Sequence, residues 1–264
     1  KKKPSLKVKF ISESDGGIYD AINKGISMSS GKYISILNSD DIFHSHMSVE
    51  KMMKSIIKDE QYDLFFFGLT YFRNKAFRKV VRYYPAKNFK TWMLKYGIIP
   101  PHPASVIKKT CYEKNGYYDK NFKIAGDFDL FLRFIYLNKV KYKTFKYNSV
   151  RMKTGGASGK NLLSYIISLK ENYQSFTNNN LFANAFLILL KIPSKLIQYI
   201  FLNQNFLNLG FKLPKEIIDK EVYLNQIKVI QDPNKIMNKN FVLSGLNLAF
   251  LGYYFNNEVK LYKD

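Results

Sequence analysis

Two acidic segments of the chain place carboxylates where an α/β sheet would bind a ligand. In the first, the apolar run 33–37 leads into Asn38, Asp40 and Asp41. A buried strand with this ending presents its acids at the carboxyl edge of a sheet, where open α/β sheets bind ligands. Adjacent carboxylates repel unless a cation lies between them, and their hard oxygens favour Mg2+ or Mn2+. We therefore predict a metal site at Asp40 and Asp41, with capping of the next helix as the simpler alternative.

The second segment, residues 125–129, opens a helix and contains Asp127 and Asp129. The helix dipole stabilises an acid at this end, so capping explains either residue, and Asp129 fits it better. Asp127 precedes the helix proper and is expected to point into a cleft. A carboxylate there could accept the proton of a hydroxyl nucleophile as a general base.

Other candidate residues carry weaker signals. Asp15 precedes Gly16 and Gly17, and a helix with Asp20 and Asn23 follows. Glycines before a helix let the backbone approach a phosphate, although a structural turn explains the same pattern. Three further residues have simpler explanations: His102 between two prolines is more often structural, and His44 and His46 lack a third ligand at metal spacing.

Strand-like and helix-like patterns alternate around these residues, which predicts an α/β fold. Helical spacing covers residues 18–26, and a second helix is expected to follow an N-cap at Ser48. A strand is expected over residues 62–72, with residues 78–84 able to pair with it. Shorter elements are expected at residues 89–96 (helix), 104–107 (strand), 110–115 (a helical turn stopped by Gly116) and 144–152 (strand).

The composition excludes several classes of protein. The chain has 264 residues, 16% aromatic residues, one cysteine and a formal net charge of +22. A disordered chain would have few aromatic residues, and a single cysteine allows no disulfide framework, so we expect a reducing compartment. No signal peptide or transmembrane helix is expected.

The basic residues are mostly lysines rather than arginines. Sequence-reading nucleic-acid proteins depend on Arg, so we expect an anionic membrane surface or a phosphate-bearing substrate as partner, and no nucleic acid. Residues 162–176 form an amphipathic helix pattern, and residues 183–202 are strongly apolar with Lys191 and Lys195. The second pattern is typical of a helix lying on a membrane, although a buried helix or a subunit contact fits as well.

The order and spacing of these segments resemble the bacterial family 2 glycosyltransferases that build O-antigen, capsule and other exopolysaccharides. Residues 12–26 are similar to the family's donor-side helix, and residues 31–41 to its Asp-x-Asp strand. Residues 126–133 are similar to the segment with its catalytic base, and residues 101–105 to a loop near the acceptor. The resemblance covers residues 7–159.

The resemblance implies a GT-A fold, which is a Rossmann-like α/β mixed sheet flanked by helices, here followed by a helical C-terminal region. It implies a nucleotide-sugar donor, Mn2+ or Mg2+ as cofactor, inversion at the sugar, and a saccharide or lipid-linked acceptor. The residues that it assigns are Asp127 as the base, Asp40 and Asp41 as metal ligands, Asp15, Asp20, Asn23, Asn38 and Asp40 on the donor, and His102 and Asp129 on the acceptor side.

The chain departs from the family pattern at Asn38, which replaces the first Asp of the motif, and at Gly126, where Glu is common. We also expect that the chain starts after the strand-helix-strand unit with which the family binds the nucleotide base. The expected division is a GT-A core (residues 1–158), a basic amphipathic helical region (159–210) and a further segment (211–264). A cytoplasmic enzyme, peripheral at the inner face of the plasma membrane, is expected.

Two alternatives belong to other classes. A non-catalytic basic module for membrane or nucleic acid would interleave aromatic and basic residues on one surface, without acids that converge. A phosphoryl-transfer or hydrolytic enzyme would use the same acids and a metal.

Overall fold

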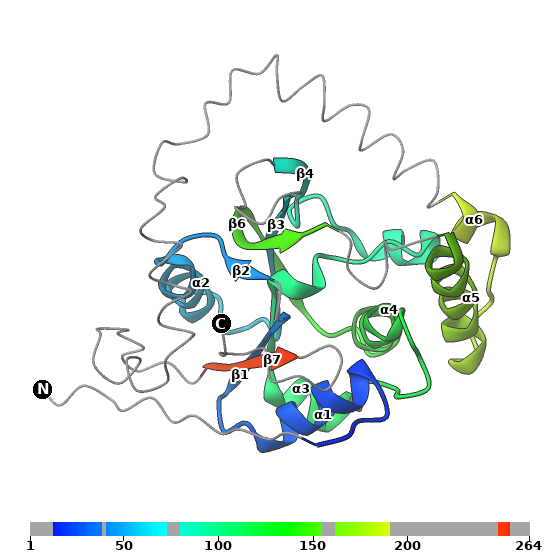
Figure 1. The fold of residues 1–264 in the computed structure, drawn as a ribbon, viewed down its shortest axis with the longest axis horizontal. Coiled ribbons are helices and arrows are strands. Elements are labelled where there is room, and N and C mark those ends of the chain that lie inside the picture. The colour runs from blue at the N-terminus through cyan, green and yellow to red at the C-terminus, as the bar shows by residue number, and fades with distance from the viewer. Residues whose placement is uncertain (1–12, 39–40, 73–79, 155–161, 191–247, 254–264) are drawn as a thin grey trace, which may run out of the picture.

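Strands from distant parts of the chain form one mixed sheet in the computed structural model, which describes residues 13–38, 41–72, 80–154, 162–190 and 248–253 (Figure 1). The sheet order is β2-β6-β3-β5-β1-β7, and β4 pairs with β3 outside that path. The strands are β1 (Tyr33–Asn38), β2 (Ile42–Phe43), β3 (Leu64–Phe72), β4 (Val80–Tyr84), β5 (Ser105–Lys108), β6 (Tyr142–Lys153) and β7 (Leu248–Tyr253). The predicted class, a mixed α/β sheet flanked by helices, is confirmed.

The strands β1, β3 and β6 run in the same direction, so their carboxyl ends meet at one edge of the sheet. β3 pairs in parallel with β6, and β5 lies antiparallel between β3 and β1. β4 pairs antiparallel with β3, as the sequence predicts for residues 78–84. β7 extends the sheet beyond β1 in a parallel register from Tyr33↔Leu248 to Asn38↔Tyr253. The acid-bearing end of β1 therefore lies at the edge where the sequence predicts ligand binding.

Helices cover both faces of the sheet because the central strand β3 is apolar on both sides. Its residues alternate, with Leu64 and Phe66 in one core cluster and Phe65 and Phe67 in the other. α2 (Ser48–Ile57) packs on the second cluster, on the left in Figure 1. The first cluster joins α1 (Ile18–Met28), α3 (Lys109–Asn115), α4 (Gly126–Phe131), the π-helical turn η3 (Leu132–Leu137) and the 3-10 helix η1 (Thr91–Tyr96).

α5 (Leu162–Asn178) follows the sheet and packs against α4. Ser175 of α5 donates a hydrogen bond to Asp129 of α4 over 2.9 Å, and Phe176 packs against Phe128. α6 (Ala185–Leu189) then packs against α5 and η1. The expected boundary at residue 158 stays a prediction, and it separates two helices that share a buried contact.

Two local predictions meet the structure differently. Gly116 ends α3 with a φ of 87°, which confirms the predicted stop, because few residues other than glycine adopt that conformation. The predicted N-cap at Ser48 is wrong, because the cap residue is Met47. Ser48 is already helical and buried, and its hydroxyl accepts a hydrogen bond from the Ser45 N–H.

Parts of the predicted pattern lie outside the described residues. These are Asp40, residues 191–202 of the predicted apolar helix, and residues 211–264 apart from β7. Within the described ranges, the structure contains no helix with both the length and the apolar run that crossing a bilayer requires.

Candidate active site

Asp127 lies in the first turn of α4, at the centre of a group of buried aromatic and polar residues. Its Oδ1 accepts a hydrogen bond from the Phe128 N–H over 2.8 Å, and its side chain is partly exposed. The negative charge of Asp127 acts on several neighbours. Burial is the main cause of the raised pKa values of Tyr19, Tyr84 and Tyr118, and the charge of Asp127 adds to each.

Tyr19 of α1 packs directly under the start of α4. Its hydroxyl donates a hydrogen bond to the Ile124 carbonyl over 2.7 Å, and its ring stacks on Tyr118 at 5.5 Å. A Cβ at Gly126 would lie 2.7 Å from the Tyr19 ring. The departure from Glu to Gly at residue 126 therefore has a physical reason, which is that the Tyr19 ring occupies the space of a side chain.

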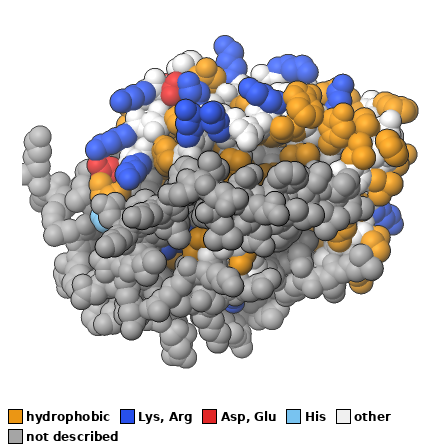
Figure 2. All heavy atoms as spheres, turned by 90° about the horizontal axis from the view of Figure 1, so that it is seen from above, with side chains coloured by type: hydrophobic (Ala, Val, Ile, Leu, Met, Phe, Trp, Pro, Cys, Tyr) orange, Lys and Arg blue, Asp and Glu red, His pale blue; other side chains and the backbone are white. Residues whose placement is uncertain are grey.

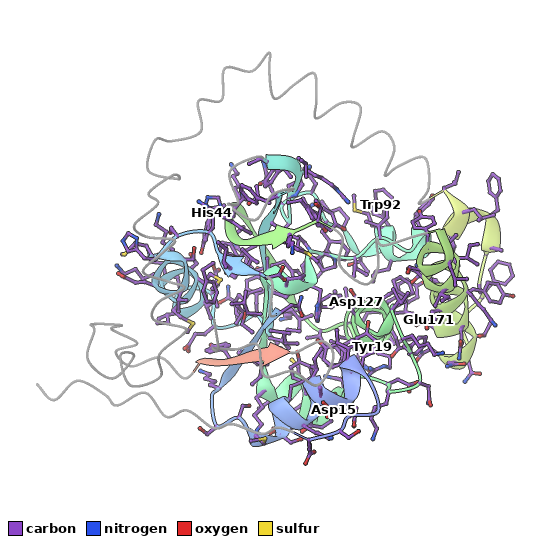
Figure 3. All side chains as sticks on the ribbon, viewed as in Figure 1. Asp15, Tyr19, His44, Trp92, Asp127 and Glu171 are labelled. Atoms are coloured by element: carbon purple, nitrogen blue, oxygen red, sulfur yellow. The ribbon has the colours of Figure 1, made fainter. Side chains whose placement is uncertain are left out.

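Glu171 of α5 holds the loop on the opposite side. Its carboxylate accepts hydrogen bonds from three consecutive backbone N–H groups, those of Lys123 (2.8 Å), Ile124 (2.9 Å) and Ala125 (2.7 Å). Glu171 itself is buried. Figure 3 shows Asp127, Tyr19 and Glu171 gathered around α4. The loop that leads to Asp127 is thus bound by side chains from α1 and from α5.

His102 lies close to the same group. Its Nε2 is 2.7 Å from the Tyr118 hydroxyl, and its ring packs edge-on against Phe131 of α4. Burial lowers the pKa of His102, and the charge of Asp127 opposes that effect. His102 and Tyr118 lie beside Ile36 of β1 around a gap too small for a water molecule. The same packed residues therefore connect His102 with β1, and His102 lies within reach of the charge of Asp127.

Asn23 supports this arrangement from α1. Its amide nitrogen donates to the Tyr118 carbonyl over 2.8 Å, and its amide oxygen accepts from the Tyr118 N–H over 3.0 Å. Both polar atoms of the Asn23 side chain thus hold the backbone of Tyr118. The predicted contact of Asn23 with the donor stays a prediction beside this observed structural contact.

Asp129 is buried, and its carboxylate faces α5 and Arg133. Oδ2 accepts from Arg133 Nε over 2.8 Å, while Oδ1 accepts from Ser175 Oγ and from Asn179 Nδ2 over 3.1 Å. Arg133 also donates to the Asn115 and Tyr117 carbonyls. The structure therefore gives Asp129 a packing contact, and its predicted place on the acceptor side stays untested.

Two hydrogen bonds join Asn38, the last residue of β1, to Asp41. The Asp41 N–H donates to the Asn38 carbonyl over 3.0 Å, and Asn38 Nδ2 donates to Asp41 Oδ2 over 2.9 Å. Asp41 is buried, and Asp40, between these two residues, lies outside the described ones. The carboxylate of Asp41 and the amide of Asn38 supply oxygen donors of the kind that Mn2+ and Mg2+ prefer. Within the described ranges, no three His, Cys, Asp or Glu residues gather as a metal site.

Asp15 and Asp20 form an ion-pair group around Lys24 at the start of α1. Lys24 Nζ lies 2.7 Å from Asp15 and 3.4 Å from Asp20, and Lys120 lies 3.3 Å from Asp20. Asp20 also accepts a hydrogen bond from the Gly16 N–H over 3.0 Å. The observed contacts of both acids are with basic residues and backbone, so their predicted contact with a nucleotide stays a prediction.

The structure thus brings together Asp127 and His102 among the predicted residues, and adds residues that sequence reasoning missed: Tyr19, Tyr118 and Glu171. One signal could have indicated Glu171, because it is the single acid between residues 162 and 190 of a strongly basic chain. An isolated acid in an otherwise uncharged helix face needs a partner.

Comparison with known proteins agrees with the sequence pattern. Residues 1–114 match the family model described as "Glycosyl transferase family 2". Two proteins from two strains of Mycobacterium tuberculosis, named "Uncharacterized glycosyltransferase MT1564" and "Uncharacterized glycosyltransferase Rv1514c", are each 33% identical over 123 residues. That match covers 46% of this chain and 45% of each relative, so the chain spans less than half of their length.

Among solved structures, the chain is similar to a crystal structure of S. aureus TarS 1-349. The TM-score is 0.40 and the identity 12%, and the match covers 81% of this chain and 59% of that chain. The residues that match the family model include α1, the acid-bearing end of β1, β3 and β5. The family model and the two relatives thus agree that residues 1–114 are similar to glycosyl transferase family 2.

Proposed function

We propose that the chain is the catalytic part of an inverting, metal-dependent glycosyltransferase. It moves a sugar from a nucleotide-sugar donor to a saccharide or lipid-linked saccharide acceptor in bacterial surface polysaccharide synthesis. The match of residues 1–114 to the family model supports the reaction class. The observation that carries the mechanism is the partly exposed Asp127 carboxylate at the start of α4, because residues of α1 and α5 hold the loop that leads to it.

In the proposed reaction, an acceptor hydroxyl attacks the anomeric carbon as the bond to the nucleoside diphosphate breaks. The hydroxyl proton goes to Asp127, and the electron pair of the broken bond leaves with the diphosphate. General base catalysis of this kind contributes about 10^2 to 10^4 in rate. His102 lies close enough to Asp127 for the carboxylate charge to affect the pKa of His102. The neutral ring of His102 would border the acceptor.

The proposed cofactor is Mn2+ or Mg2+, held by Asp40 with Asp41 as a second ligand. When bound, the ion would stabilise the negative charge on the departing diphosphate. The contact between Asn38 and Asp41 supports this assignment, because both residues bring oxygen donors to the carboxyl edge of the sheet. Asp15, Asp20, Asn23 and Asn38 are proposed for the donor side.

The test of this function is an Asp127→Asn variant. First, a panel of UDP-, GDP-, dTDP- and CMP-sugars is screened by thermal shift with Mn2+ to find the donor. The variant should bind that donor as the wild type does, and its rate of transfer should fall by a factor of about 10^2 to 10^4. The matched control is Glu113→Gln, which removes an exposed carboxylate from α3. Transfer at the wild-type rate by Asp127→Asn would refute the role of Asp127.

We also propose that the enzyme is peripheral at the inner face of the plasma membrane. Large hydrophobic side chains are exposed on α5, η1 and the segment with α6, among them Phe182 (89%), Phe186 (68%) and Trp92 (56%). Figure 2 shows hydrophobic side chains gathered on the right of the view, the end where α5 and α6 lie in Figure 1, with basic side chains beside them. Lys90 and Lys95, on both sides of Trp92, are exposed.

This combination fits an anionic lipid surface. Aromatic side chains enter the interface between head groups and acyl chains, while lysines contribute about 1 kcal/mol each near such a surface. The net charge of +22 acts in the same direction. A lipid-linked acceptor would be presented at that surface.

A further inference from the structure

The backbone groups of the loop before Asp127 form hydrogen bonds with side chains of other helices. Ala125 occupies the N-cap position of α4 and provides no side-chain cap. The N–H groups of Lys123, Ile124 and Ala125 instead converge on the single carboxylate of Glu171. Consecutive N–H groups that converge in this way form an anion-binding concavity, and here a side chain of the same protein fills it.

Glu171 is buried against this loop, and both oxygens of its carboxylate bond to the loop. Glu171 is 7% exposed, and its two oxygens both accept hydrogen bonds from the loop. Among the described residues, its observed hydrogen-bond partners are the N–H groups of this loop. Hydrogen bonds to an ionised acceptor are shorter and stronger than those between neutral groups, which fixes the backbone path to within a narrow range.

Tyr19 fixes the same loop from the other side. Its hydroxyl donates to the Ile124 carbonyl, so Ile124 is held through its N–H by Glu171 and through its carbonyl by Tyr19. The Tyr19 ring lies against Gly126, the residue next to Asp127. The peptide units before Asp127 therefore have little freedom to rotate.

We propose that Glu171 and Tyr19 are positioning residues that set the direction of the Asp127 carboxylate toward the acceptor hydroxyl. This inference rests on the proposed function, in which Asp127 is the base. Neither residue touches the reacting atoms. Both act through the backbone of residues 123–126, and a shift of about 1 Å at a catalytic group is enough to cost about 10^2 in rate.

The substitution Glu171→Gln tests this inference, because glutamine keeps the shape and removes the charge. We expect kcat for transfer to fall by about 10- to 100-fold, while KM for the donor and slow donor hydrolysis by water change by less than about twofold. A purely structural defect would lower transfer, hydrolysis and donor binding together, through a smaller folded fraction. An unchanged kcat would overturn the proposal.

A double-variant comparison separates the two explanations further. In the Asp127→Asn background, Glu171→Gln should leave the residual transfer rate unchanged within about twofold, because the residue through which it acts has been removed. A further fall of the same size as in the wild type would overturn the proposal. Glu113→Gln is the matched control for the charge, and Tyr19→Phe, which keeps the ring and removes the hydroxyl, is the second variant if Glu171→Gln does not fold.

Amide hydrogen exchange gives a readout that needs no donor or acceptor. The N–H groups of residues 123–125 should exchange at least about tenfold faster in Glu171→Gln than in the wild type, while those of β3 keep their protection. If the wild type transfers no sugar from any donor of the panel, the proposed function fails, and exchange still reports whether Glu171 holds the loop. Unchanged exchange of residues 123–125 would overturn the positioning role in either case.

Discussion

The ring of Tyr19 occupies the space that a side chain at residue 126 would need, so that Gly126 and Tyr19 fit together as a pair. A Cβ built on Gly126 meets three ring carbons of Tyr19 at 2.7, 2.8 and 2.9 Å. The ring cannot easily move away, because it stacks on Tyr118 and its hydroxyl is bonded to the Ile124 carbonyl. The glycine is thus required by packing rather than by an unusual backbone conformation.

Gly126→Ala is expected to destabilise the protein by about 1–3 kcal/mol, which is the usual cost of adding a methyl group to a filled core. Urea unfolding measures this effect. Gly16→Ala is the control, because the nearest atom to its new Cβ would be Asp20 Oδ2 at an ordinary 3.6 Å. Combining Gly126→Ala with Tyr19→Ala should cost less than the sum of the single variants, since the second change makes room for the first. Strict additivity would contradict the steric explanation.

Asp127 and Asp129 differ in their surroundings although only Phe128 separates them. Asp127 is partly exposed, and among the described residues its carboxylate accepts a hydrogen bond from the neighbouring Phe128 N–H. Asp129 is 3% exposed and bound to Arg133, Ser175 and Asn179. Asp129→Asn should therefore cost about 3 kcal/mol, because it leaves the Arg133 charge without its buried partner.

Asp127→Asn should change the free energy of unfolding by less than about 1 kcal/mol, so the two variants form a matched pair. Thermal and urea unfolding of both, measured side by side, check this prediction. Equal stability losses would contradict the assignment of one acid to packing and the other to chemistry.

The sequence predicts those features that depend on neighbours along the chain. The strand β3, the stop at Gly116 and the pairing of residues 80–84 with β3 follow from local residue types and were all predictable. The start of α4 was predictable as well, because glycine and acids before an apolar run mark it, but Asp127, which was expected before the helix, lies in its first turn.

The contacts that surround Asp127 could not be predicted in this way. Glu171 and Ala125 are separated by 46 residues, and Tyr19 and Ile124 by 105. Such pairs depend on how the helices pack on the sheet. A polar residue within a helix pattern does not indicate which distant residue will be its partner. For the same reason, Asn23 was predicted on the donor, although the structure shows both its polar atoms on the backbone of Tyr118.

His44 should make the stability of the protein sensitive to acid. Burial lowers the pKa of His44 to about 4, and the positive charges of Arg151 and Lys51 add to the effect. An unfolded histidine has a pKa near 6.5, so between about pH 6.5 and pH 4 the unfolded chain binds more protons at this residue than the folded one. The contribution of His44 to the free energy of unfolding should therefore be fully present above pH 6.5. It should fall by about 3 kcal/mol as the pH decreases to about 4.

The measurement is urea unfolding of wild type and His44→Asn at pH 7 and pH 4.5. The difference in stability between the two pH values should be smaller in the variant. His46→Asn is the control, because His46 is exposed and should leave the pH dependence as it is in the wild type. The same pH dependence in His44→Asn and wild type would contradict the prediction.

Exposed aromatic residues at the α5–α6 end should decide binding to anionic vesicles. Moving a large apolar side chain out of water contributes about 1.5–3 kcal/mol when it is fully buried. Trp92→Ala and Phe186→Ser should therefore each weaken binding to phosphatidylglycerol-containing liposomes by about tenfold, measured by flotation. Raising the salt concentration should weaken binding of all variants, because the lysine contribution is screened.

The control for this membrane prediction is an apolar residue at the other end of the molecule. Ile57 of α2 is 56% exposed, as much as Trp92, but α2 lies on the opposite side of the sheet from α5 and α6 (Figure 1). Ile57→Ser should bind liposomes like the wild type if the lipid-facing surface is the one with Trp92 and Phe186. If Ile57→Ser loses as much binding as Phe186→Ser, general hydrophobicity rather than one face governs the interaction. If the wild type does not float with anionic liposomes at low salt, the peripheral location is wrong, and transfer to a soluble saccharide acceptor would then be the form of the reaction to measure.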